Sequence, residues 1–171
     1  MTIVVMKFGG SCLVDNEAFE QIAKITNIYS DEKKVYVASA FKGITDLLLA
    51  TANHIDKPQK LRDNIALIEK RHMEVIQKIF EEESQYLEAA TNWIDKKLSE
   101  LEEVFSDIEE FGLEPYYKDY ISSFGEILST FILNQYLMSK GHDAEFISAN
   151  NLIITDDNFN NAYPLYELTN R

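Results

Sequence analysis

Two short apolar runs, at residues 3–8 and 35–40, stand near the start of the chain, and a helical pattern follows each of them. Both runs are short and rich in β-branched side chains, so they predict two buried strands of a parallel sheet. After each run, apolar side chains recur at three- and four-residue steps, which predicts an amphipathic helix. The order strand, helix, strand, helix is typical of a doubly wound α/β sheet.

The middle of the chain carries a different pattern. Two long amphipathic stripes, over residues 61–79 and 87–105, contain no convincing strand. They predict an antiparallel pair of helices, inserted at 58–112 and packed on the α/β core. A further helical pattern covers residues 119–140, and the apolar stretch at 144–148 predicts a returning strand.

The composition fits one globular domain. The 171 residues are 46% hydrophobic and include 6 Gly and 3 Pro, which excludes disordered and low-complexity classes. This length is sufficient for one hydrophobic core. We therefore expect a single α/β domain over residues 1–171, with three αβα layers, a mostly parallel doubly wound sheet and the helical insertion.

The charge balance narrows the possible partners. A net charge of −13 repels phosphate backbones and anionic lipids, so we expect neither nucleic acid nor a membrane as a partner. No apolar run approaches the roughly 20 residues of a membrane helix, and no basic leader precedes the first strand, which indicates a cytoplasmic protein. The single cysteine, Cys12, cannot form an internal disulfide, and we expect it to be a small buried residue.

The segment after the first run is the strongest candidate for chemistry. Gly9 and Gly10 directly follow the predicted strand and would let the backbone approach a ligand closely. The next helix would offer free N–H groups to an anion, while Lys7 adds a positive charge and Ser11 a hydroxyl donor. The segment is not a Walker motif. A tight turn that merely requires glycine explains the same residues equally well.

The turn after the second run is its counterpart. Parallel strands end at the same edge of a sheet, so Ser39, Lys42 and Thr45 would face the same crevice as Lys7. Alternatively, Thr45 caps the next helix. In the later helix, a glycine at position 125 costs about 1 kcal/mol relative to alanine, so we expect it to have a packing reason. The neighbouring Glu126 could accept a ligand ammonium group.

Taken together and in order, these segments resemble the aspartate kinases of the amino acid kinase family. The matching stretches are VMKFGGS at 5–11, VASA with GITDLL within 37–48, DYISSFGEILS at 119–129, and a weaker match at 155–162. The first stretch is shared with other amino acid kinases. The second and third point to the aspartate branch.

The resemblance implies transfer of the γ-phosphoryl group of ATP to the side-chain carboxylate of L-aspartate, giving 4-phospho-L-aspartate for lysine, threonine and methionine synthesis. It implies that Lys7 acts as the catalytic cation and that the phosphates are bound by Lys7, Phe8, Gly9, Gly10 and Ser11. Ser39 and Thr45 would contact the aspartate, and Glu126 its ammonium group. Mg²⁺ would enter with ATP, without protein metal ligands in this chain, and the full-length enzyme would be a homo-oligomer.

The chain also departs from the family pattern. Ser11-Cys12 stands where Thr-Ser is usual, and Phe41-Lys42 replaces a smaller residue and a glycine. The later glycine-rich segment, the nucleotide-binding lobe and the regulatory ACT domains are absent. The only arginines are Arg62, Arg71 and Arg171. We therefore expect the aspartate-binding lobe of a larger enzyme, with little or no turnover alone.

Two other functions stay open. The chain could belong to a different amino acid kinase, acting on acetylglutamate, glutamate or a nucleotide, although the helix around Phe124 and Glu126 speaks against this. It could also be a non-catalytic amino-acid-binding or assembly module. Retention of Lys7, Thr45 and Glu126 makes that alternative weaker.

Overall fold

The computed structural model describes residues 2–82 and 84–170. Strands β1 (Ile3–Phe8) and β2 (Lys33–Ala38) pair in parallel, in a register that places Ile3 beside Lys33 and Phe8 beside Ala38. Helix α1 (Asn16–Ile28) connects them. The predicted βαβ opening is therefore confirmed.

The remaining elements include five helices, of which the first four follow the predicted order and the last is a short helix that the sequence pattern does not predict. They are α2 (Ile44–Ala52), α3 (Pro58–Ile79), α4 (Gln85–Phe111), α5 (Pro115–Ser139) and α6 (Tyr166–Thr169). Two 3₁₀ turns, η1 (Gly10–Cys12) and η2 (Ala149–Asn151), complete the set. Both α3 and α5 begin at a proline, which suits the first turn of a helix because its N–H has no partner there. This explains why α5 starts earlier than predicted.

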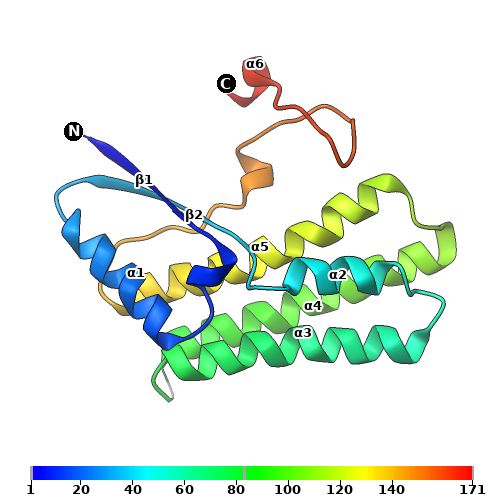
Figure 1. The fold of residues 1–171 in the computed structure, drawn as a ribbon, viewed down its shortest axis with the longest axis horizontal. Helices are drawn as coiled ribbons and strands as arrows, with labels where there is room; N and C mark the ends of the chain where they lie inside the picture. The colour runs from blue at the N-terminus through cyan, green and yellow to red at the C-terminus, as the bar shows by residue number, and fades with distance from the viewer. Residues whose placement is uncertain (1, 83, 171) are drawn as a thin grey trace.

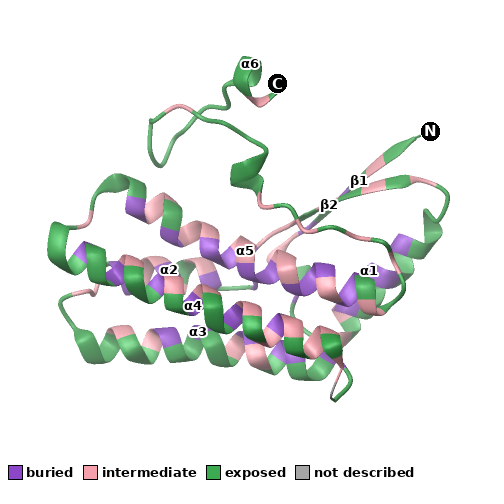
Figure 2. Cartoon of the chain, turned by 180° about the vertical axis from the view of Figure 1, so that it is seen from behind, coloured by how far each residue is buried: buried purple, intermediate pink, exposed green. Residues whose placement is uncertain are grey.

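Helix α5 forms the centre of the core. Figure 1 shows α2 and α4 beside it and α3 below, with the sheet along the upper side. Its inward side chains are fully or almost fully buried: Ile121, Phe124, Leu128, Ile132, Leu133, Tyr136 and Leu137. Figure 2 shows the same distribution, with buried residues on the inner surfaces of the helices. No helix in the described ranges is long and apolar enough to span a bilayer.

The sheet is smaller than the sequence predicts. It has two strands, and the strand predicted at 144–148 is wrong, because this stretch is extended but has no ladder partner among the described residues. One face of the sheet buries Met6 and Phe8 against the helices, whereas Ile3 and Val5 on the other face are 61% and 65% exposed. The α/β class with a parallel sheet is confirmed. The described residues supply one helical layer, and the second expected layer is not formed by them.

Candidate active site

The turns that follow β1 and β2 leave the sheet side by side. The Ser39 N–H donates to the Phe8 carbonyl at 2.9 Å, so the two segments are still hydrogen-bonded to each other where the strands end. Gly10 then lies directly against the second turn. A Cβ at this position would be 2.7 Å from the Ala40 carbonyl oxygen and 3.3 Å from the Lys42 nitrogen. Glycine is therefore required at position 10 by a contact within the protein.

Gly9 and Gly10 should respond very differently to alanine. A Cβ on Gly9 would meet nothing within 4 Å, and its φ of −77° is ordinary for any residue. We expect Gly10→Ala to lower the free energy of unfolding by about 2 kcal/mol through overpacking against rigid backbone, and Gly9→Ala to change it by less than about 0.5 kcal/mol. Urea denaturation of both variants tests this, and equal effects would contradict the contact described here.

A short turn separates the glycines from helix α1. Residues 10–12 form a 3₁₀ turn, closed by the Cys12 N–H donating to the Gly9 carbonyl at 2.8 Å. Helix α1 starts only at Asn16, and the Asp15 carboxylate caps it by accepting from the Ala18 N–H at 2.9 Å. The Asp15 carboxylate therefore takes up one N–H group at this helix end, and anion binding by the remaining ones stays a prediction.

Cys12 is also exposed rather than buried. The interior position in this loop is taken by the following residue, Leu13, which is fully buried. The exposed side of the loop therefore carries the polar and thiol groups of residues 11 and 12.

Helix α5 fixes the turn after β2 from the opposite side. The Ala40 N–H donates to Glu126 Oε1 in a long hydrogen bond of 3.4 Å, and the Ser129 hydroxyl donates to the Ser39 carbonyl at 2.8 Å. Between them, a Cβ on Gly125 would lie 2.7 Å from the Ala40 Cβ. The expectation that this glycine has a packing reason is confirmed. We call residues 10, 39, 40, 125, 126 and 129 the turn junction.

Ser129 is the member of the turn junction that sequence reasoning did not single out. It lies three residues after Glu126 and so on the same face of α5. Its full burial, which only the structure shows, explains why its hydroxyl requires a partner.

Lys7 and Thr45 lie at the same end of the sheet but outside the turn junction. Lys7 pairs in register with Val37 and is exposed. Thr45 is the second residue of α2 and half-buried, while Gly43, with φ of 78°, occupies the cap position. The alternative that Thr45 caps this helix is therefore wrong. Within residues 2–82 and 84–170, neither Lys7 nor Thr45 makes a side-chain hydrogen bond to the turn junction.

The weaker C-terminal match folds back onto the start of α5. The Asn160 N–H donates to Asp119 Oδ2 at 2.7 Å, and the Phe159 ring lies 6.0 Å from that of Tyr116. Asn160 adopts a φ of 65°, a left-handed conformation that asparagine tolerates better than most residues. The third and fourth matching stretches therefore meet at the start of α5. Arg171 lies outside the described residues.

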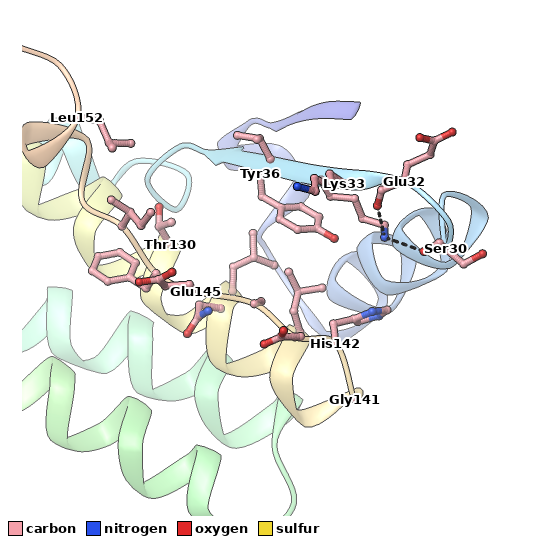
Figure 3. Close-up of a pocket in the computed structure, with 18 residues that line it drawn as sticks. Ser30, Glu32, Lys33, Tyr36, Thr130, Gly141, His142, Glu145 and Leu152 are labelled. Carbon is pink, nitrogen blue, oxygen red and sulfur yellow. Dashed lines mark hydrogen bonds between the residues drawn. The ribbon is translucent and has the colours of Figure 1, made fainter. Parts of the chain in front are cut away.

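A cavity of about 670 Å³ lies elsewhere, between β2, α5 and residues 141–147 (Figure 3). A smaller cavity of about 170 Å³ adjoins Phe41, Lys42 and Arg71. In the described part of the chain, no three His, Cys, Asp or Glu side chains gather where they could hold a metal ion. The site at the sheet edge consists of backbone amides, hydroxyls, one lysine and one glutamate.

These features define an α/β protein whose candidate ligand site lies at the carboxyl edge of a parallel sheet. Residues 2–167 match the model described as "Amino acid kinase family", and the chain belongs to this family. It is 33% identical over 170 residues to "Aspartokinase 3, chloroplastic" of Arabidopsis thaliana, covering 92% of this chain and 28% of that protein. It is 26% identical over 163 residues to "Lysine-sensitive aspartokinase 3" of Escherichia coli strain K12, covering 95% and 34%.

Among solved structures, the chain superimposes on E. coli aspartokinase III in complex with aspartate and ADP. The TM-score is 0.83 at 23% identity, over 99% of this chain and 36% of that one. A second structure of the same enzyme, with lysine and aspartate, gives a TM-score of 0.80 at 24% identity. These two likenesses establish the fold. The chain spans about a third of the length of the relatives that it matches.

Proposed function

We propose that this chain is the aspartate-binding part of an aspartate kinase, which transfers the γ-phosphoryl group of ATP to the side-chain carboxylate of L-aspartate. The observation that carries the proposal is the turn junction, in which Glu126 reaches across from α5 to the turn that bears Ser39. The aspartokinase relatives and the E. coli structure holding aspartate and ADP support the same substrate class.

In this proposal, one end of the site binds the amino acid. Glu126 accepts the ammonium group of aspartate with the carboxylate oxygen that does not bond Ala40, and the hydroxyls of Ser39 and Thr45 donate to the substrate. Phosphoryl transfer depends mainly on positioning and charge stabilisation rather than on an acid–base relay. A junction held from two sides by α5 and Gly10 is a suitable rigid support.

The other end of the site faces the phosphates. The Lys7 ammonium offsets the charge that develops on the transferred phosphoryl group, while Phe8, Gly9, Gly10 and Ser11 contribute backbone N–H groups and a hydroxyl. This donor set suits phosphate oxygens. It does not suit a metal ion, and the described residues hold no cluster of metal ligands, so we derive no step through Mg²⁺.

Aspartate binding to the 171-residue protein tests the proposal directly. Isothermal titration calorimetry should detect saturable binding of L-aspartate and weaker or no binding of N-acetylglutamate and UMP. Glu126→Gln should weaken aspartate binding by about 10- to 100-fold, since a hydrogen bond to a charged group contributes about 1.5–3 kcal/mol. Glu109→Gln, an exposed exchange on α4, is the matched control and should leave binding unchanged.

Two results would overturn the proposal. The first is the absence of saturable aspartate binding by a folded protein. The second is preferential binding of N-acetylglutamate or UMP, which would assign the chain to a different branch of the family.

A further inference from the structure

The cavity of about 170 Å³ lies between the turn after β2, the loop before α1 and the second half of α3. Figure 1 shows this half of α3 passing below the loop before α1. None of the residues that we assign to aspartate or to the ATP phosphates lines the cavity. It is therefore a second candidate site, next to the turn junction but separate from it.

Three cationic side chains line this cavity, which we call the basic cavity: Lys42, Arg71 and Lys78. Arg71 and Lys78 are seven residues apart on α3, so two helical turns bring them onto the same face. Lys42 comes from the turn after β2. The Arg71 guanidinium reaches this turn, since a Cβ on Gly43 would lie 3.5 Å from Arg71 Nη1. Positive charges from two separate segments therefore meet at the basic cavity.

These charges are not neutralised by neighbouring carboxylates. Within residues 2–82 and 84–170, none of the three cations forms an ion pair. The carboxylate of Glu74 shares the lining, but its ion-pair partner is Lys70, at 3.9 Å. The whole chain carries 29 acidic residues and 16 lysines and arginines, so unpaired cations run against its overall balance. The basic cavity is thus a local positive region that attracts anions to an acidic molecule.

The volume of the basic cavity limits the size of its ligand. About 170 Å³ is several times the roughly 30 Å³ that one water molecule occupies in the liquid. It is also below the roughly 300 Å³ at which sites for drug-sized ligands begin. A nucleotide is therefore too large, whereas a tetrahedral oxyanion fits. The guanidinium of Arg71 suits such an anion because its planar fork binds two phosphate oxygens at once.

We propose that the basic cavity binds a small phosphate dianion, held by the Arg71 guanidinium and neutralised by Lys42 and Lys78. The dianion would join α3 to the turn after β2, which carries Ser39 and Ala40, by ion pairs that the protein alone lacks. Lys42 stands where a glycine is usual in the family, so it adds a charge that the usual residue does not supply. Such a site is independent of aspartate binding.

Titration of the 171-residue protein with inorganic phosphate tests the proposal by nuclear magnetic resonance. Sodium chloride keeps the ionic strength constant, and a slightly alkaline pH keeps phosphate in its dianionic form. We expect the Gly43 amide and the Arg71 Nε–H signals to shift saturably with phosphate, and to stay in place when chloride replaces it. The shift of the Gly43 amide then gives the dissociation constant of each variant.

Opposite charge changes should have opposite effects on this dissociation constant. Arg71→Gln is expected to weaken phosphate binding by at least about tenfold, and Lys42→Gln, at an exposed position, by about two- to fivefold. Glu74→Gln removes a repelling carboxylate and should strengthen binding by about two- to fivefold. A structural role of α3 alone predicts no such gain. Arg62→Gln, the same exchange at an exposed position of α3, is the matched control and should change nothing.

Three results would overturn the proposal. The first is the absence of a saturable Gly43 shift at millimolar phosphate in the folded protein. The second is an equal shift with chloride, which would indicate screening by salt instead of a site. The third is loss of binding in Lys7→Gln but not in Arg71→Gln or Lys42→Gln, which would place the anion at the edge of the sheet.

Discussion

Replacing Gly125 by valine lowers the free energy of unfolding by about 3 kcal/mol, although glycine is the poorer helix former. A Cβ at this position would lie 2.7 Å from the Ala40 Cβ and 3.5 Å from side-chain carbons of Ile44 and Leu48. These groups are buried and cannot rotate away. Helix α5 must therefore move off the turn after β2, which also weakens the Glu126–Ala40 hydrogen bond. Chemical denaturation measures the loss.

A double-mutant cycle shows whether the Ala40 methyl group causes this loss. Gly125→Ala alone is expected to destabilise the protein, and combining it with Ala40→Gly moves one methyl group from one side of the contact to the other. We expect the two changes to compensate by at least about 1 kcal/mol, as is usual for residues in direct contact. Strict additivity of the two effects would contradict the steric explanation.

The second large effect is a loss of stability on acidification that comes from His72. Burial lowers the pKa of this histidine from 6.5 to about 4; the hydrogen bond of Nδ1 to the Ile68 carbonyl opposes the shift and the Arg71 charge adds to it. Between these values the unfolded chain binds a proton that the folded protein does not. The stabilisation is complete above pH 6.5 and decreases by about 3 kcal/mol as the pH falls to about 4.

Urea denaturation between pH 7 and pH 4 measures this effect in wild type and in His72→Phe. The phenyl ring keeps the stacking on Phe41, whose ring centroid lies 4.9 Å away, but carries no titrating group. The variant should lose about 3 kcal/mol less than wild type over this range, while His54→Gln, at a partly exposed site, should follow wild type. Parallel pH profiles for wild type and His72→Phe would refute the prediction.

The elements that can be predicted from this sequence are the helices whose apolar side chains recur along one buried face. The stripes at 61–79 and 87–105 became α3 and α4 because each alone specifies an amphipathic helix. The stretch at 144–148 has the composition of a strand and is extended, but a strand also requires a partner edge, which local composition does not specify.

For the candidate site, the sequence identified the segments but not how they meet. Gly10, Gly125 and Glu126 were recognisable because each is unusual in its local pattern. That all of them meet at Ala40 could not be predicted, since the distance along the chain from Ala40 to Glu126 is 86 residues. Ser129 is an ordinary residue in a helix, and only the fold shows that its hydroxyl reaches the Ser39 carbonyl.

Ala40 lies between two glycines, with Gly10 against its carbonyl oxygen and Gly125 against its methyl group. The two limits differ in kind, because Gly125 meets a side chain whereas Gly10 meets backbone atoms that every residue carries. A residue larger than glycine at position 125 therefore becomes more tolerable once Ala40 has become glycine, but no exchange of residue 40 makes room at position 10. In evolutionary terms, positions 40 and 125 are expected to accept substitutions in a linked order, while position 10 stays glycine.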